Sequence, residues 1–109
     1  MHIREMAIQA FNNSEHKGFH KGPEGLSVPT KIALIHAEVS EALEDHRDGK
    51  ITTTFDTNGK PHGAAQELAD IVIRVGDLAE IMGVDLEAEV IMKMKYNSTR
   101  PMLHGGKKY

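Results

Sequence analysis

The spacing of apolar residues along the chain predicts four helices. In four segments, apolar residues recur at intervals of three and four positions, which places them on one face of a helix. Asp85 suits the N-cap of the last segment, and Gly49 suits the end of the second. These segments cover approximately residues 3–15, 31–47, 61–83 and 86–97. We therefore expect an all-α fold, a helical bundle of four main helices forming a single domain over residues 1–109.

Two connecting segments lack this helical pattern. Residues 16–29 are rich in glycine and proline, and we expect an exposed loop that includes His16 and His20. The alternative is that this loop, with Lys17 and Lys21, covers a bound ligand. Residues 51–61 hold one run with β-propensity, followed by the turn signal Asn58-Gly59. Because only one strand-like run is present, the second segment predicts a connecting loop with a short extended piece.

The composition narrows the classes of function. The formal net charge of -3 provides no basic surface for a nucleic acid. The absence of cysteine removes disulfides and thiolate metal sites. Residues 1–11 lack the long apolar run that is typical of a signal peptide, and no stretch approaches membrane-spanning length. We expect a cytoplasmic protein that binds no nucleic acid and no membrane.

Two acidic pairs are the main chemical feature. Glu38 and Glu41 are three residues apart in one predicted helix, and Glu67 and Asp70 are three apart in the next. Residues at this spacing share a helix face. The third helix is apolar around most of its circumference, so we expect it to be buried on most sides, with its acidic stripe facing another helix. Carboxylates gathered in a partly buried place repel one another, and a cation relieves that repulsion.

The ligand types favour a hard cation. An all-oxygen set predicts Mg²⁺, with Mn²⁺ as a substitute, over zinc or iron. Di-iron bundles carry Glu-x-x-His on two helices, which these motifs lack. The sequence also has no GxxxxGK[ST] loop, which excludes a P-loop NTPase. The competing interpretation is a purely structural network in which Arg74 and lysines pair with the acids.

A family resemblance follows from these motifs taken together. The two acidic motifs, the stretch ELADIVIRVGDLAEIMGVDLE and the segment KMKYNSTRPMLHGGK resemble the MazG-type all-α nucleoside triphosphate pyrophosphohydrolases. The likeness covers nearly the whole chain from about Lys31 onward. There is one departure, because Ala37 precedes Glu38 where many members have a second glutamate. Asp45 and Asp77 are the candidates to replace that carboxylate.

The resemblance implies a reaction and a set of site residues. Such enzymes cleave a nucleoside triphosphate, including deoxyribonucleotides, to the monophosphate and pyrophosphate in a Mg²⁺-dependent reaction that serves nucleotide-pool housekeeping. The expected catalytic residues and metal ligands are Glu38, Glu41, Glu67 and Asp70. The expected substrate-binding residues are Lys93, Asn97, Arg100, His104 and Lys107.

Assembly and substrate remain open at this point. The apolar far side of the third helix predicts a homodimer or homotetramer, in which a partner subunit completes the core. A phosphoribosyl-ATP or a dUTP/dCTP-specific pyrophosphohydrolase would share the same acidic helices. A non-enzymatic helical oligomerisation or regulatory module is the alternative of a different class.

Overall fold

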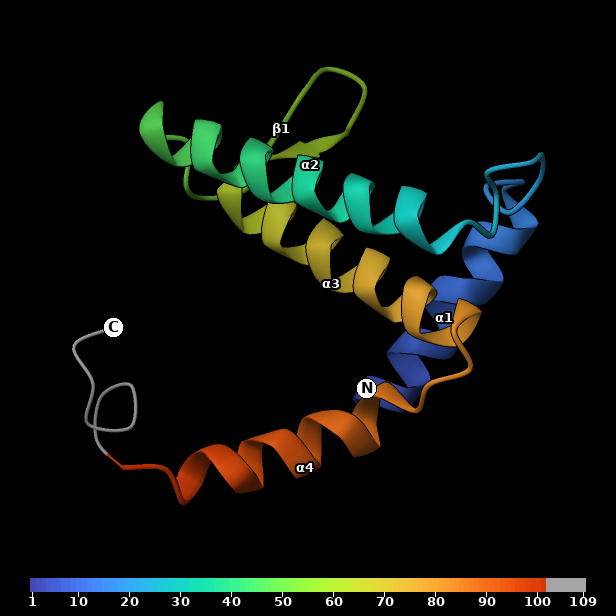
Figure 1. The fold of residues 1–109 in the computed structure, drawn as a ribbon. Helices are drawn as coiled ribbons and strands as arrows, with labels where there is room; N and C mark the ends of the chain where they lie inside the picture. The colour runs from blue at the N-terminus through green and yellow to red at the C-terminus, as the bar shows by residue number, and fades with distance from the viewer. Residues whose placement is uncertain (102–109) are drawn as a thin grey trace.

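Residues 1–101 form four helices and one short two-stranded ladder (Figure 1). The structure is a computed structural model that describes residues 1–101. The elements, in chain order, are α1 (Ile3–His16), α2 (Val28–Arg47), β1 (Thr54–Phe55), β2 (Pro61–His62), α3 (Ala64–Ile81) and α4 (Leu86–Ser98). The predicted all-α fold with four main helices is confirmed, with differences of up to three residues at the helix ends.

Helix α3 is the centre of the fold because it packs against both α1 and α2. Its contact with α1 is made through small residues. A Cβ atom added at Gly76 would lie 2.9 Å from Sδ of Met6 and 3.0 Å from Cα of Ala7. The buried apolar residues Ala7, Ala10 and Ala79 are also small. Small side chains therefore let α1 and α3 approach closely, while α2 lies along another side of α3 (Figure 1).

The segment after α2 fixes where α3 begins. The backbone N–H of Ala64 donates to the carbonyl oxygen of Lys50 at 2.8 Å, and the N–H of Ala65 donates to that of Ile51 at 3.0 Å. These bonds satisfy two of the free N–H groups at the helix N-terminus. Gly63 has φ 121°, and a Cβ atom there would collide with the carbonyl oxygen of Thr52. This position therefore requires glycine.

The expected extended piece has a partner strand. Thr54 pairs with His62 and Phe55 pairs with Pro61 in an antiparallel ladder. Between the strands, the Asp56 carboxylate accepts hydrogen bonds from the N–H groups of Asn58 and Lys60 at 2.8 and 3.0 Å. The second strand has only two residues and begins with proline, so it carries no recognisable strand pattern.

The expectation of an exposed loop is wrong at His20. Its side chain is 2% exposed, with Nδ1 2.7 Å from Oε2 of Glu15 and Nε2 2.8 Å from Oδ1 of Asp77. The ring also lies against Phe11, with the ring centroids 4.7 Å apart. A neutral imidazole has one N–H, so two carboxylate contacts require either a protonated ring or a proton on one carboxyl group. His20 therefore fastens the loop to α1 and α3.

Helix α4 extends away from the other helices. The first turn of α4 contacts α1, where the backbone N–H of Arg4 donates to Oε1 of Glu87 at 3.3 Å. From there α4 points away from α2 and α3 (Figure 1), and residues 91–100 are all exposed. Across residues 1–101, no helix has the length and apolar character needed to cross a membrane.

The contacts of His20 predict a large loss of stability in the His20→Ala variant. Asp77 would keep a buried carboxylate without its partner, which costs about 3–5 kcal/mol when one member of a buried pair is removed. Urea unfolding of the two proteins measures this difference. Glu15→Gln is the matched control, because the Glu15 side chain is 60% exposed and exposed pairs contribute at most about 1 kcal/mol. Equal effects of the two substitutions would contradict the role given to His20.

Candidate functional site

Three of the four expected ligands come together between α2 and α3. One carboxylate oxygen from each of Glu38, Glu67 and Asp70 lies within 4.8 Å of the others. Glu38 comes from α2, and Glu67 and Asp70 come from successive turns of α3. The spacing of three residues and the side-by-side packing of the two helices together produce this acidic cluster, the name used below for these three residues.

The fourth expected ligand lies at the edge of the acidic cluster. Glu41 is one turn farther along α2 than Glu38 and is exposed. Its carboxylate is outside the set of oxygens that lie within 4.8 Å of one another. It still acts on the cluster, because its proximity contributes to the raised pKa of Glu67.

Burial and like charge perturb the protonation of the acidic cluster. Burial, together with the neighbouring Glu38 and Glu41 carboxylates, raises the pKa of Glu67 to about 7. Burial and the charge of Glu38 also raise the pKa of Asp70. For Glu38, burial opposes ionisation, but hydrogen bonds with Glu67 and Arg74 leave its pKa below the ordinary value. Glu67 therefore takes up a proton more readily than Glu38 does.

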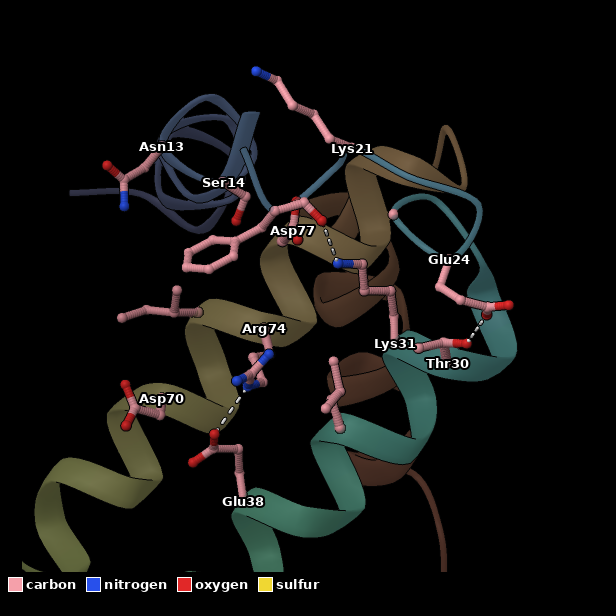
Figure 2. A pocket seen from close by; sticks show the side chains of 14 residues that line it. Asn13, Ser14, Lys21, Glu24, Thr30, Lys31, Glu38, Asp70, Arg74 and Asp77 are labelled. Atoms are coloured by element: carbon pink, nitrogen blue, oxygen red, sulfur yellow. Dashed lines mark hydrogen bonds and ion pairs between the residues drawn. The ribbon is translucent and has the colours of Figure 1, made fainter. Parts of the chain in front are cut away.

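Arg74 forms an ion pair with one of these carboxylates. Nε of Arg74 donates to Oε1 of Glu38 at 3.0 Å, and the two side chains are 40% and 12% exposed (Figure 2). The other oxygen of Glu38, Oε2, is buried and has no hydrogen-bond partner among residues 1–101. Oε2 of Glu67 is also buried and has no hydrogen-bond partner among these residues. Arg74 therefore compensates only part of the acidic cluster.

The two unpartnered oxygens test whether a metal ion fits. A buried acceptor without a partner is costly, and a cation beside it removes that cost. The donors are all carboxylate oxygens, the type that hard divalent cations prefer. The residues of the acidic cluster therefore fit such an ion.

A cavity of about 550 Å³ extends from the acidic cluster to the loop between α1 and α2. Glu38 and Asp70 lie at one end, and Lys21 and Glu24 of the loop lie at the other (Figure 2). Nζ of Lys31 donates to the carbonyl oxygen of Phe19 at 3.3 Å, which ties the loop to α2. The volume is in the range of small-molecule sites, about 300–1,000 Å³. The loop residues are functional candidates that the sequence indicated only as a segment rich in glycine, proline and lysine.

The three expected substrate-binding residues that the structure describes lie apart from this cavity. Lys93, Asn97 and Arg100 are exposed, on α4 or just after it, and none of them lines the cavity. Nζ of Lys93 is 5.3 Å from the centroid of the Tyr96 ring. His104 and Lys107 lie outside the described residues. Within one chain, the structure does not bring these described cations to the acidic cluster.

The two proposed replacements for a missing carboxylate are also elsewhere. Asp77 is bonded to His20 and lines the cavity, but it is outside the acidic cluster. Asp45 lines a separate cavity of about 300 Å³ beside the β1–β2 ladder. Neither side chain therefore takes the place of the glutamate that many MazG-type enzymes have at the position of Ala37.

Comparisons with family models, with curated proteins and with solved structures find no match to this chain. The resemblance to the MazG-type enzymes therefore rests on the motifs alone.

The raised pKa of Glu67 predicts that the metal-free fold loses stability as the pH increases. Its ordinary value of 4.5 is raised to about 7 in the folded chain, so the folded state binds the proton more tightly than the unfolded state. The contribution is complete below pH 4.5 and is lost as the pH passes about 7. Glu67→Gln cannot titrate and lacks this contribution to the pH dependence.

Urea unfolding in EDTA, across this pH window, measures the effect as the difference between wild type and Glu67→Gln. As the pH rises through this window, the unfolding free energy of wild type should fall relative to that of Glu67→Gln. The control is Glu44→Gln, which removes an exposed carboxylate paired with Arg47 on α2. Parallel pH profiles for wild type and Glu67→Gln would contradict the assignment.

Proposed function

We propose that this chain is a Mg²⁺-dependent nucleoside triphosphate pyrophosphohydrolase that converts a (d)NTP to the (d)NMP and pyrophosphate. The observation that carries the proposal is the acidic cluster, in which three carboxylate oxygens lie within 4.8 Å of one another. Two of its members, Glu38 and Asp70, line one end of a ligand-sized cavity. Two of its buried oxygens lack a hydrogen-bond partner within residues 1–101. The motif resemblance supports the choice of reaction.

Each group at the site has a part in the proposed reaction. Mg²⁺ supplies neutralisation of phosphate charge and lowers the pKa of a coordinated water. Glu38, Glu67 and Asp70 would hold the ion, and the exposed Glu41 is the fourth proposed ligand. Arg74 fixes Glu38 through Nε and has further N–H groups to donate to a phosphate oxygen. Phosphoryl transfer depends mainly on such positioning and charge stabilisation.

Pyrophosphate release from a panel of NTPs and dNTPs, with Mg²⁺ and with EDTA, tests the proposal. We expect activity with Mg²⁺ only. Glu38→Gln and Glu67→Gln should each reduce kcat/KM by more than about 100-fold, because losing a group that merely orients a ligand costs about 10–100-fold. Glu44→Gln, an exposed substitution on the same helix as Glu38, should retain wild-type activity.

Full activity in Glu67→Gln, or in EDTA, would contradict the assignment of the acidic cluster. The panel should include phosphoribosyl-ATP, dUTP and dCTP, because selective hydrolysis of one of these identifies the corresponding relative.

The non-enzymatic alternative has one observation in its favour. The ion pair of Arg74 with Glu38 belongs to the structural network that this alternative requires. An oligomerisation or regulatory module of that type would release no pyrophosphate, and Mg²⁺ would leave its Tm unchanged. The enzyme instead gains stability from Mg²⁺, since a ligand that binds only the folded state raises Tm.

The proposal includes a homodimer or homotetramer. No large side chain in the described residues is fully buried. On α3, where burial on most sides is expected, Leu68 and Val72 are 60% and 51% exposed and do not line the cavity. A second copy packed against this surface would cover it.

The position of α4 extends the proposal to the site itself. Lys93, Asn97 and Arg100 are exposed, on or just after a helix that points away from the acidic cluster of its own chain (Figure 1). In the proposed assembly, these residues serve the cavity of the second copy and donate to its phosphates. The site is then shared between chains.

Mixing two inactive variants tests this sharing. Glu67→Gln lacks an acidic ligand and Lys93→Ala lacks a phosphate donor, so each alone should be weakly active. When the two are co-expressed as a dimer, half of the molecules are mixed and each mixed molecule has one intact site. We therefore expect recovery to about a quarter of wild-type activity. Light scattering gives the assembly size, and a monomer, or a mixture with no recovery, would contradict sharing.

A further inference from the structure

We infer that the loop end of the cavity is a nucleoside-binding subsite in which the base stacks on Phe19. This inference rests on the proposed function for the identity of the ligand as a nucleotide. The relevant chemistry, however, is at the opposite end of the cavity from the acidic cluster. It involves residues of α1, the following loop, α2 and α3 that no step of the phosphate chemistry uses.

The direction of the cavity places the nucleoside. Glu38, Asp70 and Arg74 lie together at one end, and Asn13 and Lys21 lie at the other (Figure 2). A nucleotide has phosphates at one end and a base at the other. With its phosphates at the carboxylate end, where the ion would be held, its sugar and base extend toward the loop.

The loop end has the surface that a base requires. Phe19 lines the cavity and is 65% exposed, so its ring is accessible for stacking. Leu34 and Ile73 add apolar lining and are 37% and 47% exposed. Asn13 and Ser14, at the end of α1, bring an amide and a hydroxyl to the same lining. Such groups can donate to and accept from a base edge or a sugar hydroxyl.

The position of Phe19 is fixed before any ligand binds. Its backbone N–H donates to the carbonyl oxygen of Ser14 at 2.9 Å, and its carbonyl oxygen accepts from Nζ of Lys31 at 3.3 Å. The next residue, His20, is buried between Glu15 and Asp77. Because the backbone is already held on both sides of Phe19, ligand binding costs less conformational entropy for ordering this loop. This arrangement suits a stacking platform better than a loosely tethered loop tip.

The test compares two exposed phenylalanines. Phe19→Ala should raise KM by about fivefold to 150-fold, the usual effect of losing one base-stacking ring. Its kcat should be nearly unchanged, because the ring binds the ground state and the transition state equally. Phe55→Ala is the matched control. Phe55 is 70% exposed, in β1, and lines only the other cavity.

A second measurement does not depend on hydrolysis. Titration of wild type, Phe19→Ala and Phe55→Ala with AMP, GMP, CMP, UMP and dTMP, in EDTA and in Mg²⁺, reports binding of the base directly. We expect Phe19→Ala to weaken the binding of the preferred monophosphate by at least about fivefold, and Phe55→Ala to leave it unchanged. Circular dichroism confirms that both variants are folded.

The outcomes separate the subsite from the reaction. Weaker monophosphate binding by Phe19→Ala alone supports the subsite, even if no triphosphate is hydrolysed and the proposed function fails. Equal binding by wild type and Phe19→Ala overturns the subsite, even if hydrolysis is Mg²⁺-dependent. Failure of wild type to bind any of the five monophosphates under either condition also overturns it. A change of assembly size in Phe19→Ala would instead assign the ring to a subunit contact and overturn the subsite.

Discussion

Repulsion between carboxylates is the constraint under which α2 and α3 pack. The helices bring oxygens of Glu38, Glu67 and Asp70 within 4.8 Å of one another, while Arg74 bonds only one of these side chains in the described structure. The pKa of Glu67, raised to about 7, shows how the metal-free chain accommodates this charge, since a proton held there removes one negative charge. A divalent cation in the same place removes more. The fold and the proposed reaction therefore depend on the same electrostatic problem.

The backbone maintains this arrangement at both ends of α3. Gly63 allows the segment after α2 to pass directly over the N-terminus of α3, where the carbonyl groups of Lys50 and Ile51 accept its first N–H groups. Gly76, farther along, allows α1 to approach closely. Both contacts are backbone approaches that a larger residue would disturb. The relative position of the carboxylates is therefore set by the scaffold, independently of any ion.

Local patterns explain what the sequence could predict. The helices follow from apolar periodicity, and the convergence of Glu38 with Glu67 follows from two acidic pairs on helices expected to pack together. The buried place of His20 could not be predicted, because it depends on Glu15 and Asp77, and Asp77 is distant in the sequence. The direction of α4 is set by the short connection after α3 and by its contact with Arg4, neither of which leaves a periodic signal. The sequence therefore predicts that Lys93 lies in a helix, but it does not predict where that helix lies relative to the acidic cluster.

The charges lining the cavity indicate why one chain is insufficient for the proposed substrate. Its cationic and anionic side chains are Lys21, Lys31, Arg74, Glu24, Glu38, Asp70 and Asp77. Carboxylates outnumber cations in this set, whereas a triphosphate is strongly anionic and binds best where the electrostatic potential is positive. The chain's own lining therefore repels the phosphates that the proposed reaction requires. In the proposed assembly, a divalent ion on the acidic cluster would reverse part of this charge, and the exposed cations of α4 in a second copy would supply the rest. The proposal of a site completed by an ion and by a partner chain therefore accounts for both the isolated position of α4 and the excess of carboxylates in the cavity.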